Sequence, residues 1–183
     1  MSRADPLGFA AGRRPGQLVA SVGIKISALI IFSIAGLTVC PAQEYRQLGP
    51  DIFDPQAAGA GLVSHALAQA GSDHRRVLLL FGANWCPWTR RLHRALSTDA
   101  AVLQVLRGHF VLAYVDANTR KDKRRNAAVI AQYGNPLRFG IPVFVVLEWD
   151  GAILATQETQ SLAAKTDEEV ADRVRGFLAK WVP

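Results

Sequence analysis

The stretch VLLLFGANWCPWTRRLHRALS, residues 77–97, joins an uninterrupted apolar run to a segment with the spacing of an amphipathic helix. The run at residues 77–83 is apolar over the length of a strand, which is typical of a strand buried on both faces of a sheet. Pro87 suits the first turn of a helix, because its fixed φ matches the helix and its missing N–H is not needed there. The stretch therefore predicts a strand that leads directly into a helix, with Cys86 at the junction.

Further predicted elements lie on both sides of this junction. Residues 57–71 predict a helix, and after the Cys86 helix a segment capped by Asp99 precedes a buried strand at residues 109–117. Residues 118–135 predict another helix with a very basic first half, and residues 139–158 predict two strands joined by a turn at Asp150-Gly151. A last helix begins at Thr166 with an acidic first turn. This order predicts an α/β fold with a mixed central sheet flanked by helices.

Two motifs carry a resemblance to a known family. The strand that runs into Trp85-Cys86-Pro87-Trp88-Thr89, together with Gly140-Ile141-Pro142-Val143 at the later hairpin, resembles the thioredoxin superfamily, and more closely its exported bacterial members. The resemblance covers roughly residues 60–182 and implies a thioredoxin-like fold. It also implies that the Ile141–Pro142 peptide bond is cis and faces Cys86.

The candidate site follows from the chemistry of a thiol at a helix N-terminus. A thiol attacks as the thiolate, which the unpaired N–H groups of a first helical turn stabilise, and Arg90 and Arg91 add positive charge nearby. The predicted catalytic residues are Cys86, as nucleophile, and Thr89, whose hydroxyl would donate a hydrogen bond to the thiolate. The predicted substrate-binding residues are Trp85, Pro87, Trp88, Ile141 and Pro142.

Two departures from the family pattern define the expected reaction. Redox members of the family usually carry a second, resolving cysteine at the position of Thr89, and thioredoxins carry a buried Asp at the position of Leu80. Both absences argue against a general disulfide reductase. We expect a monothiol route, in which Cys86 forms a mixed disulfide with a cysteine-containing protein or a low-molecular-weight thiol, and another thiol resolves it. The alternative is a thioredoxin-fold binding module or chaperone-like adaptor that has lost catalysis.

The remaining polar motifs are assigned structural roles. His93 lies about 10 Å along the helix axis from Cys86, which is far for a general base. His65, His74 and His109 show no metal-ligand spacing with one another. Asp116 is interpreted as a loop cap, and the basic run at residues 120–125 as a solvated helix face. Tyr133, Phe139 and Trp149 are expected to serve packing. No metal or cofactor is predicted.

The first 42 residues have the order of an export signal. A basic leader precedes an apolar stretch at residues 26–39, and small residues at Cys40 and Ala42 suit cleavage before Gln43. An uncleaved membrane anchor is the main alternative; a lipoprotein signal ending at Cys40 is disfavoured by Val39, and a twin-arginine signal by the residues that follow Arg14. We therefore expect a leader or anchor at 1–42, a linker at 43–56 and a thioredoxin-like domain at 57–183, exported, most simply to a bacterial periplasm.

Charge sets further limits on the partners. The formal net charge is +6, and half of it lies in the first 42 residues. The remaining excess is too small to indicate nucleic-acid binding. We expect a monomer that binds no nucleic acid, with a possible membrane tether at the N-terminus.

Overall fold

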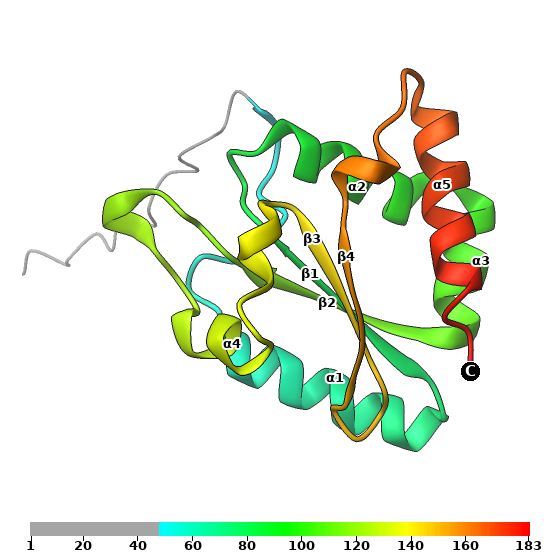
Figure 1. The fold of residues 1–183 in the computed structure, drawn as a ribbon, viewed down its shortest axis with the longest axis horizontal. Coiled ribbons are helices and arrows are strands. Elements are labelled where there is room, and N and C mark those ends of the chain that lie inside the picture. Colours follow the sequence, from blue (N-terminus) through cyan, green and yellow to red (C-terminus); the bar gives the residue numbers. More distant parts are fainter. Residues whose placement is uncertain (1–47) are drawn as a thin grey trace, which may run out of the picture. The chain divides into compact units, whose positions relative to one another are not determined.

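The computed structural model describes residues 48–183, so the predicted leader and Cys40 lie outside the described residues. The elements follow the predicted order closely (Figure 1). The α-helices are α1 (Gly59–Asp73), α2 (Pro87–Thr98), α3 (Ala100–His109), α4 (Ala127–Gln132) and α5 (Asp167–Ala179), and the strands are β1 (Arg76–Gly82), β2 (Phe110–Asp116), β3 (Val143–Leu147) and β4 (Ile153–Glu158). Three short 3-10 helices within the described residues are η2 (Lys121–Lys123), η3 (Pro136–Phe139) and η4 (Gln160–Leu162).

The sheet is mixed, as predicted. Its four strands have the order β2-β1-β3-β4. β1 pairs parallel with β2 and antiparallel with β3, and β3 pairs antiparallel with β4. β1 is thus a central strand, and its carboxyl end delivers the chain to Cys86 from the middle of the sheet.

Helices cover both faces of the sheet, which makes the domain a three-layer α/β sandwich (Figure 1). Alternate residues of β1 point to opposite faces. Leu78 and Leu80 join an apolar cluster with α2, α3 and α5, whereas Leu79 and Phe81 join a second cluster with α1 and α4. This explains the uninterrupted apolar run in the sequence, because both faces of β1 are buried.

Two helix caps and one turn that the sequence predicts are present in the structure. The Asp99 side chain caps α3 by accepting a hydrogen bond from Val102 N. Thr166 and Glu169 form a reciprocal capping box at the start of α5. Gly151 has a φ of 92° in the β3–β4 turn, a conformation that favours glycine. Within residues 48–183, no helix is both long and apolar enough to cross a membrane.

The basic run at residues 120–125 differs from its prediction. It does not form the first half of a helix: Arg120 and Arg124 are extended, and only η2 lies between them. Asn126 then adopts the left-handed conformation, with a φ of 54°, and α4 begins after it. Its side chain is held in place, since Asn126 Nδ2 donates to the Asp116 carbonyl and Oδ1 accepts from Gly59 N, both at 2.9 Å. These long-range contacts override the local helical pattern.

Candidate thiol site

Cys86 lies where the sequence places it, between β1 and α2. It is the N-cap residue of α2, with Pro87 in the first turn. The Cys86 side chain is buried, with 7% of its surface exposed. It is a free thiol and the only cysteine in residues 48–183. A resolving cysteine is therefore absent from the described part of the chain.

The Ile141–Pro142 segment lies opposite this thiol, as the family resemblance implies. The Ile141–Pro142 peptide bond is cis. The Cys86 thiol is placed to donate a long hydrogen bond to the Ile141 carbonyl, with an Sγ–O distance of 3.9 Å. Ile141 is partly exposed and Pro142 is buried. The thiol thus faces the backbone at residues 141–142, and this geometry brings the two quoted motifs together.

A buried threonine connects Trp88, next to the thiol loop, with the Ile141–Pro142 segment. Thr159 follows β4 and is 1% exposed. Its hydroxyl donates to the Pro142 carbonyl at 2.5 Å and accepts from Trp88 Nε1 at 3.1 Å. Arg91 lies over the Trp88 ring, 5.8 Å from its centroid. Trp88 is therefore a partly buried bridge to Pro142, in addition to any contact with substrate.

Trp85 is held on the other side of the thiol. Its Nε1 donates to Asn118 Oδ1 at 3.2 Å, and the guanidinium of Arg120 lies 5.0 Å from the ring centroid. Asn118 is buried and follows the end of β2. The ring keeps partial exposure. The loop that carries Cys86 is thus fixed by one tryptophan on each side.

Thr89 does not make the hydrogen bond that the sequence suggests. Its side chain is 0% exposed, and its Oγ1 has no hydrogen-bond partner, so the predicted contact with the Cys86 sulfur is not formed. The side chain packs toward β1: a Cβ added to Gly82 would lie 2.7 Å from Thr89 Cγ2 and 2.9 Å from Phe53 Cζ. Thr89 therefore fills space beneath the thiol loop.

The two arginines after Thr89 are both engaged in structural contacts. Arg90 Nε donates to the Asn84 carbonyl at 2.8 Å, and its Nη1 donates to the Pro50 carbonyl at 2.9 Å. Arg91 pairs with Asp167 at 2.6 Å, at the start of α5. Both guanidinium groups are therefore directed to partners other than the Cys86 sulfur.

Asn84 fastens the segment before α1 to the thiol loop. Its Oδ1 accepts from Ile52 N at 2.8 Å and Phe53 N at 3.0 Å, and its Nδ2 donates to the Phe53 carbonyl at 2.9 Å. Phe53 is 1% exposed and belongs to the core cluster of α2 and α5. The packed domain thus includes part of residues 43–56, the segment interpreted as a linker.

Asp116 has a larger structural role than a loop cap. The carboxylate is 3% exposed, accepts from Asn118 N at 3.0 Å, and pairs with Arg125 at 2.5 Å. Burial raises the pKa of Asp116 above its ordinary value, and the hydrogen bond and charge of Arg125 oppose this effect. The ion pair ties the basic run to the end of β2, so Arg125 is not part of a solvated helix face.

His93 is a structural histidine, as the sequence indicates. Its Nδ1 lies 3.1 Å from the Tyr114 hydroxyl, with the two rings in edge contact. Burial, and then the charge of Arg90, lowers the pKa of His93 below its ordinary value of 6.5. Burial raises the pKa of Tyr114 to about 12. Among residues 48–183, no group of three or more His, Cys, Asp or Glu side chains is placed to hold a metal ion.

The aromatic residues assigned to packing divide into two groups. Tyr133 is buried in the cluster under α1 and α4. Phe139 and Trp149, in contrast, are 45% and 54% exposed, so the packing role predicted for them is wrong. Phe139 is the last residue of η3, just before the Ile141–Pro142 segment. The guanidinium of Arg138 lies over the Phe139 ring.

Sequence reasoning missed the polar residues that support the site. Asn84 lies two positions before Cys86, so its place in the motif was a usable signal. Thr159 and Asn118 lie far away in the chain, and a single buried hydroxyl or amide after a strand has no recognisable pattern. These residues become visible only when the fold brings them to Trp88 and Trp85.

Comparisons with known proteins agree with this architecture. A family model described as "Thioredoxin-like" matches residues 61–148. A crystal structure of a disulphide isomerase from Xylella fastidiosa Temecula1 is similar, with 30% sequence identity and a TM-score of 0.61; the match covers 72% of this chain and 96% of that chain. A solution structure of a thioredoxin from Thermus thermophilus matches at 23% identity and a TM-score of 0.45, over 64% of this chain and 84% of that one.

A DsbH oxidoreductase matches at 20% identity and a TM-score of 0.47, over 63% of this chain and 81% of that one. No curated protein matches the chain. The family model and the 30%-identical structure place the chain plainly: it belongs to the thioredoxin superfamily and has a thioredoxin-like fold.

Proposed function

We propose that the protein carries out thiol–disulfide exchange by a monothiol mechanism, with Cys86 as the nucleophile. The observation that carries the proposal is the position of Cys86: a free thiol at the N-cap of α2 that faces the Ile141 carbonyl across the site. The similarity to a disulphide isomerase supports the same chemistry.

The reaction proceeds in two balanced exchanges. The Cys86 thiolate attacks one sulfur of a substrate disulfide, a new Cys86–substrate disulfide forms, and the other sulfur leaves as a thiolate. A second thiolate, from the substrate or from a small thiol, then attacks the substrate sulfur and releases Cys86. The total number of disulfides does not change. In isomerisation the substrate keeps its oxidation state, and in the removal of a small thiol the protein is reduced while the external thiol is oxidised to a disulfide.

The residues around Cys86 have supporting roles in this proposal. Trp85, Pro87 and Trp88 belong to the loop and first helical turn around Cys86, and the Ile141 carbonyl, next to Pro142, faces the thiol from the opposite segment. In this proposal these five residues contact an extended substrate segment. Thr89 stands where a resolving cysteine would be, and its hydroxyl does not reach the sulfur. Its role is to leave the mixed disulfide for an external thiol to resolve.

We also propose that the domain acts outside the cytoplasm as a monomer. The basic leader and the apolar stretch at residues 26–39 support export, with cleavage before Gln43 or retention as a membrane tether. Fractionation of the producing cells and mass measurement of the mature N-terminus test this part. A mature chain that begins at Met1 in the cytoplasm would contradict it.

The matched pair Cys86→Ser and Cys40→Ser tests the mechanism on the full chain. We expect the Cys40→Ser protein to form a mixed disulfide with a disulfide-bonded peptide and to release it on addition of a second thiol, whereas the Cys86→Ser protein forms none. Mass spectrometry of the quenched reaction detects the adduct. If neither variant forms an adduct but both hold unfolded substrate proteins, the binding-module alternative replaces the enzymatic one.

A further inference from the structure

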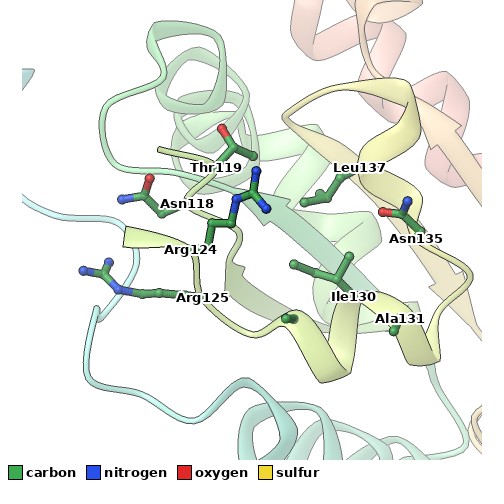
Figure 2. Close-up of a pocket in the computed structure, with 9 residues that line it drawn as sticks. Asn118, Thr119, Arg124, Arg125, Ile130, Ala131, Asn135 and Leu137 are labelled. Carbon is green, nitrogen blue, oxygen red and sulfur yellow. The ribbon is translucent and has the colours of Figure 1, made fainter. Parts of the chain in front are cut away.

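A second feature lies close to the thiol site. A pocket of about 460 Å³ opens between the end of β2 and the segment that holds α4 and η3 (Figure 2). A volume of this size lies within the range that small-molecule sites occupy in proteins. The predicted site residues do not line it, so it needs a separate explanation.

The pocket has one apolar part and one polar part. Ile130, Ala131 and Leu137 supply aliphatic surface, and Asn118, Thr119 and Arg124 supply polar groups. In Figure 2 the guanidinium of Arg124 points into the pocket, whereas Arg125, which also lines the pocket, directs its guanidinium away from it. A ligand that suits this lining has an aliphatic portion and at least one anionic group.

The two neighbouring arginines differ in their partners. Arg125 is neutralised by the buried carboxylate of Asp116. Arg124 is exposed, and among residues 48–183 it has no hydrogen-bond, ion-pair or ring partner. An unpaired guanidinium at the mouth of an apolar pocket is well suited to a carboxylate, which it binds through paired N–H donors.

The pocket is connected to the thiol loop by shared side chains. Asn118 lines the pocket and accepts the hydrogen bond from Trp85 Nε1, one residue from Cys86. Ile130 and Leu137 pack against the same apolar cluster as Ile141, whose carbonyl faces the Cys86 sulfur. A ligand held in the pocket therefore lies against the residues that frame the thiol.

We propose that this pocket binds the carboxylate-bearing part of a low-molecular-weight peptide thiol, with Arg124 as the specificity-determining residue. This inference rests on the proposed exchange function and names its small-thiol substrate class. In the reaction, the Cys86 thiolate attacks the disulfide of the bound molecule, the Cys86–S–S–peptide bond forms, and the other half leaves as a thiolate.

The kinetic test uses the full chain carrying Cys40→Ser and two probes: oxidised glutathione, an anionic peptide disulfide, and 2-hydroxyethyl disulfide, which is neutral. We expect Arg124→Gln to slow adduct formation with oxidised glutathione by about tenfold, the effect of one charge-assisted contact. The rate with the neutral probe should not change. Arg107→Gln is the matched control, because Arg107 is exposed near the opposite end of β2.

A variant that fills the pocket tests the same assignment without changing the charge. Ala131 is exposed on α4 and lines the pocket, so Ala131→Phe fills it. We expect this variant to slow the reaction with oxidised glutathione and to leave the neutral probe unaffected. If Arg124→Gln and Ala131→Phe react with both probes at unchanged rates, the inference is overturned and the exchange function stands.

A binding measurement separates the two proposals. S-methylglutathione has no reactive thiol, so its binding to the Cys86→Ser protein does not depend on exchange chemistry. We expect NMR shift changes at residues 127–131 that Arg124→Gln abolishes. Absence of these changes in the Cys86→Ser protein would overturn the pocket assignment. If S-methylglutathione binds but Cys86 of the Cys40→Ser protein reacts with no disulfide, the pocket assignment is supported and the proposed exchange function is ruled out.

Discussion

Thr159 donates a hydrogen bond to the Pro142 carbonyl at 2.5 Å, and the same hydroxyl accepts one from Trp88. The Pro142 segment and the thiol loop, 54 positions apart at Trp88, are thus joined through one oxygen atom. Because Thr159 is buried, water does not compete for these bonds. The width of the site between Cys86 and Ile141 therefore depends on a residue outside both motifs.

Thr159→Val should reduce both stability and exchange. The substitution keeps the shape but removes the bridging oxygen and leaves the Pro142 carbonyl without this donor, which costs about 1–3 kcal/mol of unfolding free energy. Denaturant unfolding measures the stability, and adduct formation at Cys86 measures the exchange. Thr156→Val, on the preceding strand β4 and only partly buried, is the control. Equal behaviour of the two variants would show that the bridge has no role.

Thr89→Val should leave exchange unchanged and raise the free energy of unfolding by about 1 kcal/mol. The reason is that Thr89 Oγ1 is buried without a partner, and removal of such a group relieves a desolvation penalty. Thermal unfolding and the rate of adduct formation at Cys86 are the measurements. A slower reaction in this variant would mean that the hydroxyl reaches the thiolate during turnover, as the sequence suggested.

Thr89→Cys should convert the site into a dithiol pair. Positions 86 and 89 are three apart at the start of α2. Helix geometry puts Cα atoms three residues apart at about 5 Å, which is within the Cα–Cα range of a disulfide. We expect the variant to form an intramolecular disulfide on oxidation and to lose the long-lived mixed disulfide of the parent. Thiol titration and intact mass report both changes. A variant that keeps two free thiols under oxidising conditions would contradict the expected geometry.

Asn84→Ala should release the segment at residues 51–54. Three hydrogen bonds join Asn84 to Ile52 and Phe53, so their loss costs about 2–4 kcal/mol. Hydrogen exchange at the amides of Ile52 and Phe53 should become faster before the rest of the core responds. Asn84→Asp keeps an acceptor for both amides, so it should show a smaller effect. Unchanged protection in the alanine variant would rule out the anchoring role.

His93 should make the domain less stable below pH 6.5. Its folded pKa is lowered, so the unfolded chain binds the proton more readily, and the stability present above pH 6.5 is lost as the pH falls toward the folded value. His93→Gln should flatten this dependence, and His65→Gln, at an exposed position, should not. Thermal melts across this pH window provide the comparison. A profile unchanged by His93→Gln would assign the acid sensitivity to another group.

The fold and the principal site residues are accessible from the sequence because they depend on local signals. The apolar run of β1, Pro87 at the start of α2 and Ile141–Pro142 are contiguous patterns with a direct physical meaning. Long-range polar contacts are not accessible in this way. The left-handed Asn126, held by Asp116 and Gly59, ended a predicted helix that composition alone favoured. The inward packing of Thr89 next to Gly82 likewise requires the folded chain.

The attachment of residues 52–53 to Asn84 has a mechanical consequence. The chain reaches the core of the domain through these residues, and their hydrogen bonds end on a side chain two positions before Cys86. A pulling force applied at residue 48 is therefore transmitted to the thiol loop before it loads the central strands. Tension along the N-terminal side of the domain would distort the reactive cysteine at forces lower than those that unfold the sheet.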